Sequence, residues 1–222
     1  MITMNKNKFY FSKRHKCFKH GSTWLIGVMT FLERTLWPQN AIPRIHGARG
    51  GLERGKRIHN DIALWVQLPL QRRRIMDLSG YATYARRLII ATVRLKIVHP
   101  HLRIWSELPV GCINRRVGTA CDLVAEQPNG TLVLVEWKSG YGKETSYSRL
   151  HSAAIRECGV PMTMKNIHFC QLVATRVLFE HTFQRCIARM FLIRVHSKGV
   201  TVYKTPKWTS RLLKYFREVI SF

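Results

Sequence analysis

Two acidic residues lie inside apolar, strand-like segments near the middle of the chain. Asp122 lies in the segment 119–126, and Glu136 lies in the run LVLVEWK at 132–138. Acidic residues are scarce, because the 222 residues include 12 Asp and Glu against 37 Lys and Arg. Burying a carboxylate costs free energy unless a cation or a hydrogen-bonding group compensates for it. The pattern therefore favours a fold that brings both acids to a shared cation.

The two segments have the features of neighbouring antiparallel strands. The run at 132–138 is rich in β-branched and apolar residues. The sequence QPNG at 127–130 supplies a turn, since Pro restricts φ and both Asn and Gly tolerate positive φ. In a hairpin closed near Pro128 and Asn129, facing residue numbers sum to about 258, so Asp122 would lie opposite Glu136, roughly 5 Å away at Cα.

Carboxylates that face each other across a hairpin repel, and a divalent cation between them converts this repulsion into binding. Mg²⁺ and Mn²⁺ prefer carboxylate oxygens. Side chains alternate along a strand, so Lys138 should point to the same face as Glu136 and contact a water or a phosphate oxygen there. The alternative interpretation is a surface hairpin that carries an ordinary Glu-x-Lys sequence.

Five short signatures occur in order over roughly residues 50 to 182. They are GKRIHNDI at 55–62, WSELPV at 105–110, GTACD at 118–122, VEWKSG at 135–140 and QLVAT at 171–175. In this series the chain resembles the PD-(D/E)XK nuclease superfamily, and within it the RecB-like exonuclease branch. That branch often has a Tyr four residues after the Gln of the last signature, where this chain has Thr175.

The resemblance implies an α/β fold with a PD-(D/E)XK, restriction-endonuclease-like core, in which helices flank a central mixed sheet. It implies that His59, Asp122 and Glu136 bind Mg²⁺ or Mn²⁺ and that Lys138 orients the attacking water. Glu107 and Gln171 would support the catalytic site. The implied activity is exonuclease-like, metal-dependent hydrolysis of DNA in replication, repair, viral or mobile-element processing.

Each of the less specific residues also has a structural interpretation. His59 lies on the inward face of a helical pattern, where a histidine can be a packed core residue. Glu107 can be a solvent-facing strand residue, and Gln171 can be a buried amide bonded to the backbone. Tyr141 belongs either to a plain turn or to a surface that stacks on a base.

The charge of the chain indicates a polyanionic partner. The formal net charge is +25 and the isoelectric point is near 10.6, which makes nucleic acid the first candidate. We expect DNA, as a single strand or as duplex ends, with RNA also open. Arg72, Arg73 and Arg74 are candidate phosphate contacts, although they also fit a solvated turn. A noncatalytic basic nucleic-acid-binding module of a larger nucleoprotein complex is the rival function.

The chain divides into a basic N-terminal arm with a short helix at 1–45 and a nuclease-like domain at 46–222. The arm is expected to be flexible to about residue 20, with the helix at 22–37 and a linker at 39–51. In the domain we expect helices at 52–66, 81–98, 145–157, 167–184 and 208–220. The expected strands are 102–110, 119–126, 131–138, 189–196 and 200–203.

Cysteine spacing and hydropathy bear on the compartment. The six cysteines include no C-x-x-C pair, which favours free thiols in a reducing, intracellular compartment. No apolar run approaches the roughly 20 residues that cross a bilayer, so no membrane partner is expected. The acid-free, basic residues 1–32 leave the nucleus and the mitochondrion open.

Overall fold

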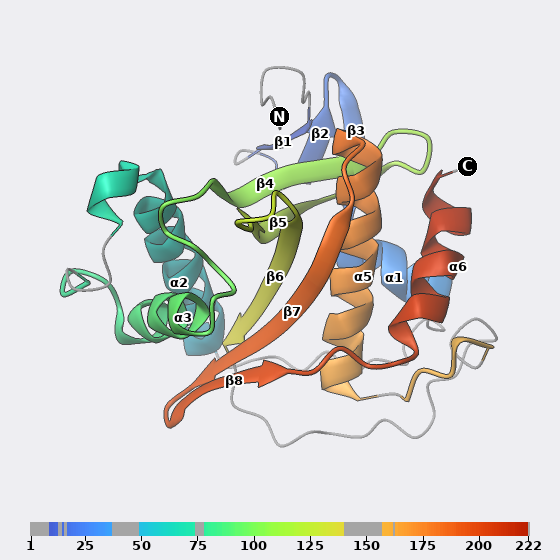
Figure 1. Ribbon diagram of the computed structural model, residues 1–222. Coiled ribbons are helices and arrows are strands. Elements are labelled where there is room, and N and C mark those ends of the chain that lie inside the picture. Colours follow the sequence, from blue (N-terminus) through green and yellow to red (C-terminus); the bar gives the residue numbers. More distant parts are fainter. Residues whose placement is uncertain are drawn as a thin grey trace.

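The protein has an α/β fold built on a mixed sheet (Figure 1). This computed structural model describes residues 9–12, 15, 17–36, 49–73, 78–139, 157–161 and 163–221. Within this part the sheet has eight strands in the order β1-β2-β3-β5-β6-β7-β8, with β4 paired to β5. The α/β class with helices flanking a mixed sheet is therefore confirmed.

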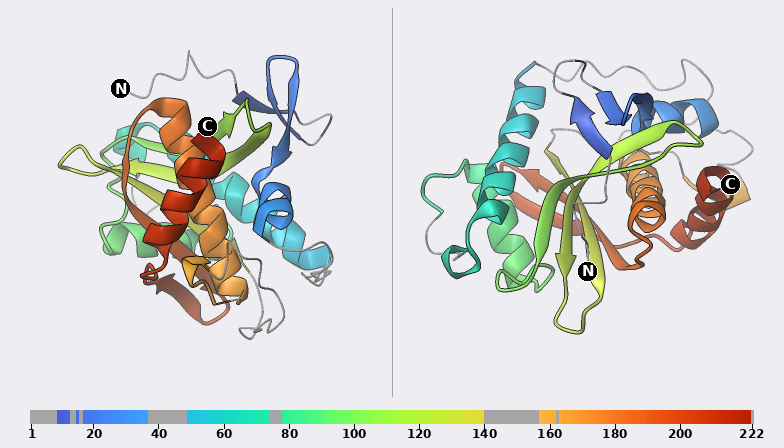
Figure 2. Two further views of the ribbon diagram at one scale, coloured as in Figure 1. Left: turned by 90° about the vertical axis from the view of Figure 1, so that its right-hand side faces the viewer. Right: turned by 90° about the horizontal axis from the view of Figure 1, so that it is seen from above.

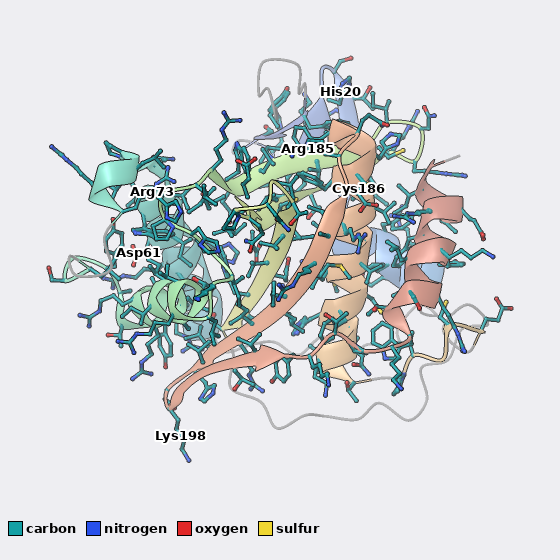
Figure 3. All side chains as sticks on the ribbon, viewed as in Figure 1. His20, Asp61, Arg73, Arg185, Cys186 and Lys198 are labelled. Carbon is teal, nitrogen blue, oxygen red and sulfur yellow. The ribbon has the colours of Figure 1, made fainter. Side chains whose placement is uncertain are left out.

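The central strands are β4 (Ile104–Cys112), β5 (Val117–Glu126), β6 (Leu132–Ser139), β7 (Ile187–His196) and β8 (Gly199–Tyr203). β4, β5 and β6 are antiparallel neighbours, β7 runs parallel to β6, and β8 returns antiparallel to β7. Lys198 lies at the tip of the β7–β8 hairpin and points away from the sheet (Figure 3).

The register of the β5–β6 hairpin agrees with the prediction. Leu123 faces Val135 and Glu126 faces Leu132. A turn that follows Gln127, in which Gly130 has a φ of 78°, joins the two strands. Because this turn is local in sequence, its residues determine which strand residues face each other.

Helices cover both faces of the sheet (Figure 2). The helices α1 (Val28–Leu36), α5 (Met164–Phe183) and α6 (Thr209–Ser221) pack on one face in a cluster that we call the α5 core. The helices α2 (Arg49–Gln67) and α3 (Thr83–Arg94) pack on the other face in a second cluster, the α2 core. Alternate residues of β6 serve the two cores: Leu132 and Leu134 face α5, whereas Val133, Val135 and Trp137 face α2.

The N-terminal region differs from the prediction. Instead of a flexible arm, residues in the first 27 positions form β1 (Phe9–Ser12), β2 (Cys17–His20) and β3 (Thr23–Gly27), and α1 begins only at Val28. β3 pairs with β5 in parallel. This pairing attaches the β1–β2 hairpin, through β3, to the rest of the sheet. The predicted boundary near residue 45 and the linker at 39–51 fall largely outside the described residues.

The aromatic residues of this region explain the error. Phe11 and Phe18 face each other across the β1–β2 pair, with ring centroids 5.1 Å apart. The Phe9 ring lies over Gly111 of β4, where a Cβ atom would come within 2.7 Å of it. Apolar contact with the sheet therefore orders a segment that its basic composition suggested was free.

The remaining predicted elements are present with shifted bounds, except that most of the helix expected at 145–157 lies outside the described residues. α5 begins at Met164, after Thr163, whose side chain accepts a hydrogen bond from the Asn166 backbone N–H at 3.2 Å. All six cysteines are unpaired thiols. Among the described helices, none has the length and apolar character required to cross a membrane.

Candidate metal centre

Three neighbouring strands each place one carboxylate in the same row across the sheet. The residues on either side of Glu107 in β4 pair with the residues on either side of Asp122 in β5. The pairing of β5 with β6, in which Leu123 lies opposite Val135, brings Asp122 next to Glu136 of β6. The row therefore reads Glu107, Asp122, Glu136, with the Asp122 strand in the centre.

Strands β4 and β5 change the core against which they pack at the level of this row. Ile104 packs in the α2 core and Leu108 packs in the α5 core. In a regular strand, residues four positions apart lie on the same face. On β5 the same change occurs between Cys121 and Leu123. Glu107 has a φ of 50°, in the left-handed region that interrupts a regular strand. The carboxylates thus lie where the sheet passes from one core to the other.

Helix α2 brings a histidine to this point. His59 Nδ1 lies 2.7 Å from Glu107 Oε1 and 3.8 Å from Asp122 Oδ1. These three residues offer ligand atoms that all lie within 4.8 Å of one another. Gly55, one turn earlier on α2, faces the Ser139 hydroxyl, which a Cβ atom would approach to 3.6 Å. This close approach places α2 against the end of β6.

Glu136 and Lys138 lie beside the cluster. Glu136 is 1% exposed, and its Oε1 accepts a hydrogen bond from Lys138 Nζ at 2.5 Å. Glu136 Oε2 is buried with no hydrogen-bond partner among the described residues. Asp122 Oδ2 accepts a hydrogen bond from the Trp137 backbone N–H at 3.0 Å, which leaves Oδ1 on the side of His59. The orphaned Glu136 oxygen and the clustered donors fit a divalent cation.

The electrostatics also favour a cation. Burial and the negative charge of Glu136 raise the pKa of Asp122 from 3.8 to about 8. Burial alone would lower the pKa of His59, but the hydrogen bond that its imidazole donates to Glu107 and the nearby carboxylate charges raise it overall. The same competition, between burial and the charges of Glu136 and Asp122, raises the pKa of Lys138. Without a cation, the cluster retains protons that a cation would displace.

The structure brings together five of the predicted site residues. Those together are His59, Glu107, Asp122, Glu136 and Lys138. Glu107 contributes directly to the metal-binding group, whereas the sequence suggested only a supporting role. Its signal was the isolated acid in an apolar strand, the same signal that identified Asp122.

Among the described residues, Gln171, Arg72 and Arg73 make no hydrogen bond or ion pair with these five. Gln171 is half-buried on α5. Arg72 is exposed at the end of the short helix η2 (Leu70–Arg72). The Arg73 guanidinium donates to the backbone oxygen of Leu68 at 2.9 Å and to that of Leu102 at 3.4 Å, so it joins the end of α2 to the segment before β4. The remaining two predicted contacts, Arg74 and Tyr141, lie outside the described residues.

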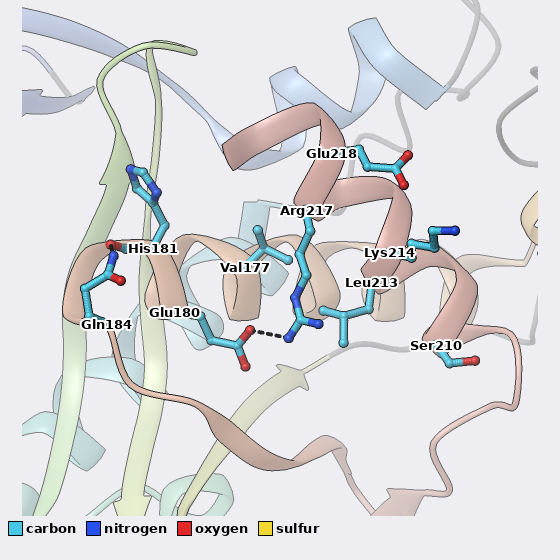
Figure 4. Close-up of a pocket in the computed structure, with 9 residues that line it drawn as sticks. All are labelled: Val177, Glu180, His181, Gln184, Ser210, Leu213, Lys214, Arg217 and Glu218. Atoms are coloured by element: carbon cyan, nitrogen blue, oxygen red, sulfur yellow. Dashed lines mark hydrogen bonds and ion pairs between the residues drawn. The ribbon is translucent and has the colours of Figure 1, made fainter. Parts of the chain in front are cut away.

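A groove of about 560 Å³ lies between α5 and α6, and its lining contains none of the metal-centre residues (Figure 4). Glu180 at its base accepts hydrogen bonds from Arg176, Arg217 and the Ile187 backbone N–H. These partners, acting against the effect of burial, lower the pKa of Glu180. The charged groups of the groove therefore join α5, α6 and β7.

Comparisons with known proteins add little. No protein-family model matches the chain, and no curated protein sequence matches it. A solved structure titled "Crystal structure of SSO0001" is similar, with 13% identity over 78% of this chain and 87% of that chain, at a TM-score of 0.32. A likeness of this size carries no argument about the fold or the function.

Proposed function

We propose that the protein is a metal-dependent deoxyribonuclease that hydrolyses phosphodiester bonds, with a PD-(D/E)XK core of the RecB-like type. The observation that carries the proposal is the carboxylate row Glu107, Asp122 and Glu136, with His59 on one side and Lys138 on the other. The sequence signatures around these residues support the same assignment.

The donor set suits a hard divalent ion. Carboxylate oxygens favour Mg²⁺ or Mn²⁺, and an imidazole nitrogen makes Mn²⁺ a strong candidate as well. His59, Glu107 and Asp122 would hold the ion, and the free Oε2 of Glu136 offers a further oxygen. A bound ion of this kind lowers the pKa of a water molecule and polarises a phosphate oxygen.

The protein groups position the reactants. The Trp137 backbone N–H fixes Asp122, and the contact between Lys138 and Glu136 keeps an ammonium group at the edge of the centre. A charged Lys138 can donate a hydrogen bond to the attacking water and offset negative charge that develops on the phosphate. In this mechanism water attacks directly, so the protein needs no covalent nucleophile.

The net charge of +25 supports a polyanionic substrate. We propose DNA, as single strands or duplex ends, with exonuclease-like cutting in replication, repair or mobile-element processing. Binding that rests on phosphate contacts should weaken steeply as salt concentration rises.

The test is cleavage of end-labelled single- and double-stranded DNA with Mg²⁺, with Mn²⁺ and with EDTA. Glu136→Gln removes the charge at the centre, and Glu126→Gln, at the turn end of the neighbouring strand β5, removes one charge away from it as a matched control. The proposal expects metal-dependent cutting that is lost in Glu136→Gln and retained in Glu126→Gln. Equal cutting by both variants would contradict the site assignment.

The noncatalytic alternative has a distinct result in the same assay. Salt-sensitive DNA binding without cutting by the wild type, under every metal condition, would favour a nucleic-acid-binding module. The same experiment with labelled RNA would show whether the protein distinguishes DNA from RNA.

A further inference from the structure

A second row of polar residues crosses the sheet two positions beyond the carboxylate row. Lys138 of β6 pairs with Arg194 of β7, and Arg194 pairs with Thr201 of β8. Glu136 and Lys138 share the α5 side of β6 with Leu134, and Arg194 shares the α5 side of β7 with Leu192. Because neighbouring strands lie about 4.8 Å apart, this row places two cations side by side under α5.

Helix α5 adds a histidine to these two cations. His168 is half-buried in the first turns of α5. Burial, together with the charges of Lys138 and Arg194, lowers the pKa of His168 to about 3. Both charged groups that act on this imidazole are therefore cations, and the ring is a neutral hydrogen-bonding group at neutral pH.

The same surface continues toward β8. Lys165 lies three residues before His168, on the same side of α5. Its Nζ is 5.7 Å from the centre of the Tyr203 ring at the end of β8. A basic path thus begins at half-buried Lys138, His168 and Arg194 and reaches a third cation, Lys165, and an aromatic ring.

Lys138 is paired with Glu136, and the positive charges of Arg194 and Lys165 beyond this pair attract an anion in a region where water screens charge poorly. We propose that Arg194, His168 and Lys165 bind a second phosphate of the nucleic-acid strand, next to the phosphate that Lys138 contacts. The strand then leaves the metal centre across β7 toward β8, where Tyr203 can stack on an unpaired base. This subsite rests on the proposed function for the nucleic-acid ligand and for the role of Lys138.

The first experiment measures binding of a fluorescein-labelled oligothymidylate in EDTA over a range of salt concentrations. The variant is Arg194→Gln, and the matched control is Arg189→Gln, which removes an exposed arginine from the opposite side of the same strand. Loss of one phosphate contact should reduce the slope of log K against the logarithm of the salt concentration by about one unit. It should also weaken binding on the order of tenfold. Mn²⁺ affinity, measured separately, should not change.

The second experiment follows the His168 ring resonances by NMR while unlabelled oligothymidylate is added to saturation. The subsite requires a His168 response in the wild type that is lost or much reduced in Arg194→Gln. Equal binding by the two arginine variants, or a His168 ring that does not respond, would overturn the subsite.

These measurements separate this inference from the proposed function. A protein that shows the Arg194 and His168 effects but never cuts DNA would retain the subsite and lose the nuclease. A protein that cuts DNA and shows neither effect would retain the nuclease and lose the subsite.

Discussion

Replacing Asp122 with Asn should stabilise the metal-free protein, although it removes a residue of the proposed site. Asp122 is buried beside Glu136, and these surroundings raise its pKa from 3.8 to about 8. The unfolded chain releases this proton near the ordinary pKa, whereas the folded chain holds it until about pH 8. Stability is therefore greatest below about pH 4 for this group and falls as the pH rises toward 8.

The size of the effect follows from this difference. At pH 7 the folded chain retains a proton about three pH units above the unfolded pKa, and each unit corresponds to about 1.4 kcal/mol. The upper bound on the cost is therefore about 4 kcal/mol. Water entry and local rearrangement reduce such penalties, so we expect Asp122→Asn to gain about 1–3 kcal/mol. The amide oxygen can still accept the Trp137 backbone hydrogen bond.

Urea unfolding in EDTA at about pH 5, 7 and 8 measures this gain. Asp122→Asn should exceed the wild type by an amount that increases with pH. Glu126→Gln, which makes the same change in net charge on the same strand, should show no such gain. A variant that is no more stable than the wild type, or whose gain does not vary with pH, would refute the electrostatic reasoning.

Metal binding, the Glu180 ion pairs and the docked N-terminal hairpin provide three more tests. Mn²⁺ affinity, measured by calorimetry, should rise with pH and level off above about 8, because binding displaces the Asp122 proton; an affinity independent of pH would contradict this. Glu180→Gln should lower the unfolding free energy by about 1–2 kcal/mol, because the neutral amide no longer offers a charged acceptor to Arg176 and Arg217, and Mn²⁺ affinity should not change. Gly111→Ala should displace Phe9 and accelerate proteolysis of the β1–β2 hairpin, since the added Cβ would lie 2.7 Å from that ring; unchanged cleavage would show that the hairpin does not depend on this contact.

Local sequence patterns predicted the central hairpin well. The turn at 127–130 specifies the pairing of β5 with β6, and the alternation along β6 assigns its residues to opposite faces. Both are short-range properties, because a tight turn and the pleat determine which residues face each other. The position of Asp122 next to Glu136 follows from these properties alone.

Contacts between segments that are distant in the sequence were harder to predict. The N-terminal residues were interpreted as a free arm because their basic charge is visible in the sequence, whereas the packing of Phe9 on Gly111 is not. The pairing of Lys138 with Arg194 depends on a parallel connection through α5, whose register no turn specifies. The positive φ at Glu107 is likewise a product of the folded sheet.

The sequence by itself determined the charge of the chain, the rarity of its acids and the hairpin that places two of them side by side. The family resemblance implied that His59 joins Asp122, but only the tertiary structure decided that Glu107 completes this group and that Arg194 and His168 lie beside Lys138. The reason is physical. Alternation and turns act over a few residues, whereas these groupings depend on how two helices pack on opposite faces of a sheet.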